Sequence, residues 1–89
     1  MQALRARFAA RCAGDLACLQ DLAATGRMAG DEARALAHSL AGAGATFGFP
    51  DVSTAAGDLD DAYVEGRAPS EAEVAALIAA LQAVVTPAS

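Results

Sequence analysis

The chain has 89 residues and a formal net charge of −5, and its six cationic side chains are all arginines. Hydrophobic residues make up 55% of the sequence, and much of this share is alanine, the residue with the highest helix propensity. The composition therefore predicts one helical domain over residues 1–89. The acidic balance argues against binding to nucleic acid and against a basic membrane-binding face.

The sequence also lacks the pattern of a membrane or secreted protein. No apolar run approaches the roughly 18 residues that a spanning helix needs. The start, MQALRARFAARCAGD, spreads its arginines instead of separating a basic from an apolar region as a signal peptide does. We therefore expect a cytoplasmic protein. Cys12 and Cys18 are six residues apart, a spacing that fits neither a zinc site nor a redox motif, so we interpret them as small buried thiols.

Glycines and prolines divide the sequence into five predicted helical segments. The first is short, about residues 2–13, and ends at Gly14. The second begins near Asp15, which has the residue type of an N-cap. The third opens with Asp31 as its N-cap and runs to about Phe47, with Leu40 among its inward-facing residues.

The last two segments have clear signals at their starts. Pro50 suits the first turn of the fourth segment, which ends before Gly66. The fifth follows a capping box formed by Ser70 and, three residues on, Glu73. Short connections between amphipathic helices make sequence neighbours antiparallel. The predicted fold is an all-α, up-down-up-down antiparallel four-helix bundle with a short extra N-terminal helix, which either caps the bundle or continues into the second segment.

His38 is the sole histidine of the chain, and the helical spacing predicts that it faces outward. It lies two residues from Leu36 and two from Leu40, and residues two apart do not share a helix face. If those leucines face the core, the histidine stands on the exposed side of its helix. Its neighbours on that side are Arg34, Ala41, Gly42 and Ala45.

The position of the following helix can be estimated from the turn. A tight turn near Phe49 makes the third and fourth segments mirror each other, so that facing residues have numbers that sum to about 98. His38 then faces Asp60, with Asp61 as the alternative. A carboxylate beside one ring nitrogen fixes the tautomer and makes the other nitrogen a better nucleophile. The same estimate places Asp31 opposite Arg67, an exposed ion pair of little energetic value.

Simpler interpretations of this stretch remain open. Gly42, Gly44 and Gly48 could serve close helix packing, with His38 an ordinary surface residue. The run GAGATFG has the wrong spacing for a phosphate-binding glycine loop and no strand before it. One histidine with one carboxylate supplies too few ligands for a typical zinc site, so we expect no metal in this chain.

The stretch AHSLAGAGATFGF resembles the core of histidine-containing phosphotransfer (HPt) domains. The family pattern is His-x-Leu-Lys-Gly, followed by an aromatic residue or leucine before a glycine. Here it reads His38, Leu40 and Gly42, then Phe47 and Gly48. The HS beginning and TFGF ending of this stretch look most like the phosphotransfer domain of chemotaxis kinases, and the resemblance covers the third and fourth segments.

The resemblance implies a bacterial two-component phosphorelay protein of the cytoplasm. His38 would carry the phosphoryl group and exchange it with the aspartate of a response-regulator receiver domain, which would hold the Mg²⁺. Gly42 would leave room for the receiver's loops, and Asp60 stands where family members often have Glu or Gln hydrogen-bonded to the ring. The implied partners are this receiver and a sensor or hybrid histidine kinase. Such a protein is expected to be a monomer without cofactor, and not an enzyme with turnover of its own.

One departure from the family pattern affects the chemistry. Ala41 stands where the family has a lysine whose cation offsets the charge of the phosphoryl group. Arg34, one turn before His38, is the best local substitute. The departure favours an alternative function, a non-phosphorylated pseudo-HPt module that binds and regulates a kinase or receiver. A helical dimerisation domain unrelated to signalling has the alanine-rich composition alone in its favour.

Overall fold

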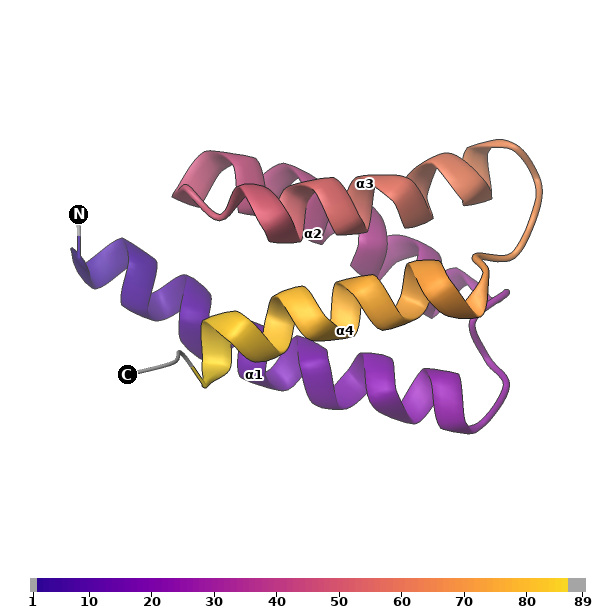
Figure 1. Cartoon of the computed structure of the whole chain (residues 1–89), viewed down its shortest axis with the longest axis horizontal. Helices are drawn as coiled ribbons and strands as arrows, with labels where there is room; N and C mark the ends of the chain where they lie inside the picture. Colours follow the sequence, from indigo (N-terminus) through magenta and orange to yellow (C-terminus); the bar gives the residue numbers. More distant parts are fainter. Residues whose placement is uncertain (1, 87–89) are drawn as a thin grey trace.

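The computed structural model describes residues 2–86, and of residue 2 the backbone alone. Over this range the chain forms four helices and no strand (Figure 1): α1 (Gln2–Ala24), α2 (Asp31–Phe47), α3 (Pro50–Val64) and α4 (Glu71–Val85). The predicted all-α class is therefore confirmed. None of these helices combines the length and the apolar character that a membrane crossing requires.

The N-terminal third of the chain forms one helix, α1, where two were predicted. Gly14 lies in its middle and does not interrupt it. A glycine in a helix costs about 1 kcal/mol relative to alanine. Phe8, Cys12 and Leu19 are buried on one face across the predicted break, and their burial outweighs this cost. The separate N-terminal helix and the cap at Asp15 were wrong predictions, and the segment continues into the next.

The helices pack as two pairs. α2 contacts mainly α3, and α1 contacts mainly α4. Figure 1 shows α4 alongside α1 and α3 alongside α2, with each helix running back against the one before it. The buried core cluster draws on all four helices and consists of Phe8, Cys12, Leu19, Ala37, Leu40, Val52, Ala55, Ala56, Leu59, Leu77 and Leu81.

The two cysteines differ in burial. Cys12 is fully buried, as predicted, and burial raises the pKa of its thiol. Cys18 is half-buried. Its thiol donates a hydrogen bond to Oε2 of Glu32 on α2 at 3.3 Å, and this bond raises its pKa. Both thiols are free.

The turn between α2 and α3 is tight and held from two sides. Gly48 adopts the left-handed conformation (φ 82°), and the backbone N–H groups of Gly48 and Phe49 both donate to the carbonyl of Gly44. Pro50 then begins α3 with the φ angle that a first helical turn needs. The ring of Phe49 stacks on that of Phe8 with 5.0 Å between centroids, which fastens the turn to α1.

α2 and α3 come closest together at Gly44. A Cβ at this position would lie 2.8 Å from the backbone nitrogen of Ser53 and 3.1 Å from its Cα. Beside this contact, the Ser53 hydroxyl donates to the carbonyl of Ala41 at 2.8 Å. Close packing thus explains Gly44 and not Gly42, where no atom comes within 4 Å of the absent Cβ.

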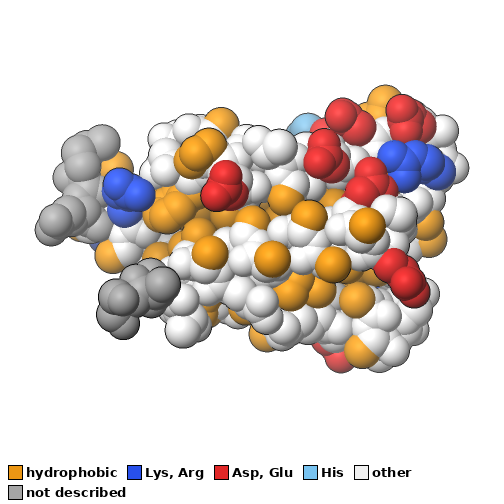
Figure 2. Space-filling model, viewed as in Figure 1, with side chains coloured by type: hydrophobic (Ala, Val, Ile, Leu, Met, Phe, Trp, Pro, Cys, Tyr) orange, Lys and Arg blue, Asp and Glu red, His pale blue; other side chains and the backbone are white. Residues whose placement is uncertain are grey.

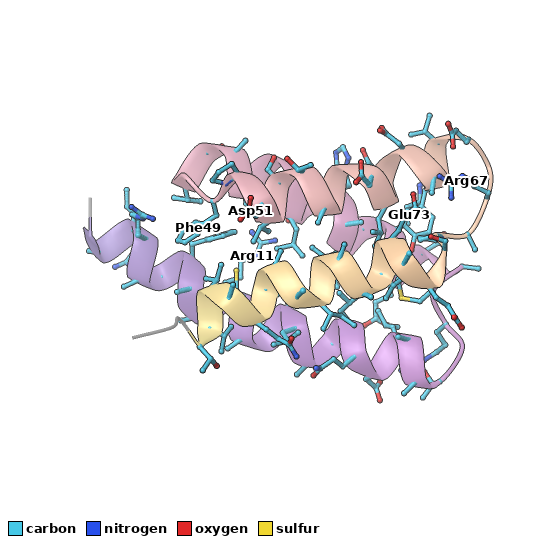
Figure 3. The ribbon with its side chains drawn as sticks, viewed as in Figure 1. Arg11, Phe49, Asp51, Arg67 and Glu73 are labelled. Carbon is cyan, nitrogen blue, oxygen red and sulfur yellow. The ribbon has the colours of Figure 1, made fainter. Side chains whose placement is uncertain are left out.

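The start of α4 carries the predicted capping box. The Ser70 hydroxyl accepts from the Glu73 N–H at 3.1 Å, and Glu73 accepts from the Ser70 N–H at 2.8 Å. Figure 3 shows Arg67 at the same corner, where its guanidinium donates to both carboxylate oxygens of Glu73 at 2.9 and 3.1 Å. Arg67 also pairs with Glu65. The predicted Asp31–Arg67 ion pair is absent from the described residues, because these two nearer carboxylates engage the arginine.

A pair of glycine substitutions tests the close contact of α2 and α3. Gly44→Ala puts its methyl group against the backbone of Ser53, so we expect a loss of about 1–3 kcal/mol in the free energy of unfolding. Gly42→Ala is the matched control. Its methyl group meets open space, and we expect a gain of about 0.5–1 kcal/mol from helix propensity. Urea unfolding of both variants measures the difference, and equal effects would contradict the assigned contact.

A second prediction concerns pH. The hydrogen bonds from Arg67 and from the Ser70 backbone lower the pKa of Glu73 to about 2. A carboxyl whose pKa is lower in the folded state stabilises the fold above its unfolded pKa and loses this effect as the pH falls towards the folded pKa. Glu73→Gln keeps the capping box and removes the charge. We expect wild type to have the higher Tm above about pH 5 and the difference to vanish near about pH 2. A pH-independent difference would contradict the assignment.

Candidate functional site

His38 stands on the outer face of α2. Ala37 and Leu40, on either side of it in sequence, are buried, and the helical rotation turns the histidine away from them. Its side chain is 79% exposed. The outward orientation predicted from the leucine spacing is therefore confirmed, and the ring is open to a partner molecule.

Asp60 reaches the ring from α3. Its neighbours Leu59 and Ala62 are buried, which turns Asp60 towards the edge that α3 shares with α2. The Nδ1 atom of His38 lies 3.4 Å from each of the two carboxylate oxygens. Asp60 is 27% exposed, while the alternative, Asp61, is exposed and faces solvent. The mirror arrangement of the two helices thus predicted the correct carboxylate, while the functional role of the pair stays a prediction.

This arrangement determines which ring nitrogen is available. With Asp60 beside Nδ1, the favoured neutral tautomer carries its proton on Nδ1. This N–H then donates a hydrogen bond to the carboxylate. The Nε2 lone pair is then directed away from the carboxylate. A contact of 3.4 Å is long for a hydrogen bond. In this tautomer the unprotonated ring nitrogen is Nε2, on a side chain that is 79% exposed.

A shallow groove of about 540 Å³ surrounds the ring. It is lined by Asp31, Arg34, Ala35, His38, Asp60 and Val64. Arg34 supplies a cation to this groove, and among residues 2–86 it takes part in no ion pair. Its guanidinium is therefore available to an anionic group brought to His38, and bidentate binding of phosphate oxygens suits its geometry.

Beyond the ring, the surface of α2 is formed by residues with small side chains. Gly42 and Ala45 are exposed, and Ala41 is half-buried against the edge of the core. Packing within the chain does not require a glycine at position 42, since no atom lies within 4 Å of its absent Cβ. The helical glycines Gly14 and Gly57 are open in the same way.

One cation near the site, Arg11, was not predicted. Arg11 of α1 donates from its Nη2 to the hydroxyl of Ser39, the residue after His38, and from its Nε to Asp15 at 3.0 Å. The pairing with Asp15 is an (i, i+4) contact that the sequence does reveal. The bond to Ser39 depends on how α1 packs on α2, which no local pattern specifies.

Among residues 2–86, no three His, Cys, Asp or Glu side chains gather into a possible metal-binding group. Asp60 and Asp31 alone supply carboxylates to the His38 groove, and two carboxylates with an exposed ring make a poor zinc site.

The four helices thus carry an exposed histidine with a carboxylate 3.4 Å from one ring nitrogen. A family model described as Hpt domain matches residues 3–86. The match covers nearly the whole chain, so the chain belongs to the Hpt domain family. Comparisons with curated proteins and with solved structures found no match.

Membership of this family indicates the general function of the chain. Hpt domains take part in histidine phosphotransfer within phosphorelays and are transfer modules rather than conventional enzymes. They interact with histidine kinases and with receiver domains.

Removal of the Asp60 carboxylate tests its effect on the ring. In Asp60→Asn we expect the preference for the Nδ1–H tautomer to weaken, because an amide no longer favours a proton on the facing nitrogen. Nitrogen-15 chemical shifts of the two ring nitrogens at neutral pH report the tautomer ratio. Asp61→Asn is the matched control and should leave the ratio unchanged. A ratio that responds equally to both substitutions would contradict the role given to Asp60.

Proposed function

We propose that residues 1–89 act as one phosphotransfer domain that accepts a phosphoryl group on Nε2 of His38. Asp60 orients the imidazole. His38 exchanges the phosphoryl group with the aspartate of a response-regulator receiver domain. A sensor or hybrid histidine kinase supplies the phosphoryl group to that receiver. The observation that carries the proposal is the exposed ring of His38, whose Nδ1 lies 3.4 Å from Asp60.

The reaction is an in-line displacement at phosphorus. The neutral Nε2 attacks the phosphorus of the receiver's aspartyl phosphate, an N–P bond forms, and the P–O bond to the aspartate breaks to release the carboxylate. The reverse step returns the phosphoryl group. Such transfers depend on positioning and on charge neutralisation more than on covalent assistance. Mg²⁺ held by the receiver supplies most of the neutralisation, and this chain holds no cofactor of its own.

Docking involves the surface formed by Arg34, Ala41, Gly42 and Ala45. Its small side chains let the backbone of a receiver approach the ring closely, and a low, weakly polar patch of this kind is typical of a partner site. Ala41 stands where the family has a lysine. Arg34 takes over the role of this lysine, since Arg34 lines the same groove as His38.

One chain contains every residue of the proposed site, so the transfer requires a single copy. The alternating helix directions in Figure 1 fit the up-down-up-down bundle that the sequence predicts. The proposal includes a cytoplasmic location, which is where the receiver and the kinase's catalytic domains act.

A second function has one specific observation in its favour. Ala41 removes the usual cation, and a module that binds a kinase or receiver without being phosphorylated needs neither that cation nor a nucleophile. Such a pseudo-HPt module would keep the bundle and the docking surface. The presence of His38 beside Asp60 favours the phosphorylated form instead.

The test offers radiolabelled, charged receivers and kinases to wild type and to His38→Gln. We expect label on the wild type alone, stable to base and labile to acid, as a phosphohistidine is. If receivers bind but label neither protein, the pseudo-HPt function replaces the proposal, and Ala41→Lys is the variant to examine next.

Docking is tested separately with two kinds of donor. Gly42→Gln places bulk on the open surface beside His38 without touching the ring. We expect transfer from a receiver to fall by at least about tenfold, which corresponds to about 1.4 kcal/mol. Transfer from a small phosphoramidate, which needs no docking, should be unchanged. Equal rates from the receiver in both proteins would contradict the assigned docking surface.

A further inference from the structure

Val64 is the last residue of α3, and its apolar side chain lies in solvent. It is 74% exposed, more than Leu4, the other exposed large hydrophobic residue among residues 2–86. The residues near it on α3 are acidic, since Asp60 and Asp61 precede it and Glu65 follows it. Figure 2 shows acidic side chains gathered to one side of the histidine. Single exposed hydrophobic residues are common, so the significance of Val64 depends on what lies opposite to it.

Val64 lies across a groove from Arg34. Both residues line the groove of about 540 Å³ that surrounds the His38 ring. α2 and α3 lie side by side (Figure 1), and their register brings Asp60 to 3.4 Å from Nδ1 of His38. Arg34 is one helical turn before His38 on α2, and Val64 is one turn after Asp60 on α3. The contact of the histidine with the aspartate therefore has a counterpart one turn away, where an arginine faces a valine.

The carboxylates of α3 near this position do not pair with Arg34. Asp60 lies beside the ring nitrogen of the histidine. Glu65 accepts a hydrogen bond from Nε of Arg67 at 3.0 Å, at the corner where α3 ends. Asp61 is exposed and does not line the groove. Among residues 2–86, Arg34 consequently takes part in no ion pair.

The charge balance of the groove makes a free arginine valuable for phosphotransfer. The charged residues that line it are Arg34, Asp31 and Asp60, so carboxylates already outnumber cations. Asp31 lies three residues before Arg34 on α2, and no ion pair joins the two among the described residues. A phosphoryl group adds about two negative charges at neutral pH. A third carboxylate facing Arg34 would leave no free cation in the groove for the phosphoryl oxygens.

We infer that Val64 influences the reactivity of His38 by leaving the guanidinium of Arg34 unpaired. An acidic residue at this position, of the kind that α3 carries on either side of it, would pair with Arg34 across the groove. Valine brings no charge, so Arg34 stays available for bidentate binding of phosphoryl oxygens. Val64 is thus a positioning residue, which acts through Arg34 and does not touch the reacting atoms. The inference rests on the proposed phosphotransfer at His38 and names the residue that keeps its cation free.

The facing of Val64 and Arg34 is tested without any phosphoryl group. Val64→Glu introduces a carboxyl whose titration carbon-13 NMR can follow. We expect its midpoint to lie about 0.3 pH units lower in Val64→Glu than in Val64→Glu/Arg34→Gln, the shift that an exposed ion pair gives. Circular dichroism verifies that both variants are folded. Equal midpoints would overturn the inference, because a carboxylate at this position would then leave Arg34 as free as valine does.

The effect on reactivity is tested with a small phosphoramidate as the donor. We expect Val64→Glu to be phosphorylated about tenfold more slowly than Val64→Gln, the matched variant of the same length without charge. When Arg34→Gln is added to both, the difference should fall below about threefold, because the cation that the carboxylate occupies is gone. An equal difference with and without Arg34 would overturn the role of Val64, since the new charge would then act directly. A wild type that takes no phosphoryl group would instead overturn the proposed function.

Discussion

The close approach of α2 to α3 at Gly44 is the contact on which the site depends. With a side chain absent at this position, the backbone of Ser53 packs directly on α2, and the Ser53 hydroxyl bonds to the carbonyl of Ala41. The turn at Gly48, which joins the end of α2 to the start of α3, fixes the register of these two helices. Six residues before Gly44 on α2, this register brings Asp60 to Nδ1 of His38. Packing at a glycine thus places the carboxylate beside the ring.

The two sides of the bundle have different chemistry. The α2–α3 side carries the exposed histidine, the arginine beside it and the acidic residues of α3. The outer face of α4 is uncharged and alanine-lined.

The sequence predicted the site better than it predicted the first helix. The spacing of Leu36, His38 and Leu40 and a mirror turn were sufficient to pair His38 with Asp60, since a tight turn transmits register from one helix to the next. Gly14 was taken as a break because local propensity was weighed without the buried face that spans it. The bond from Arg11 to Ser39 was out of reach for a related reason: it depends on the packing of α1 on α2, which no turn connects closely.

The most direct test of the account is to phosphorylate the chain with a small phosphoramidate, without any partner, and to locate the phosphoryl group by nitrogen-15 and phosphorus-31 NMR. We predict a single product on Nε2 of His38, because Asp60 lies beside Nδ1. Phosphorylation of Nδ1, or a mixture of both isomers that Asp60→Asn leaves unchanged, would contradict the orienting role of the carboxylate. Failure of His38 to react at all would contradict its role as the phosphoacceptor.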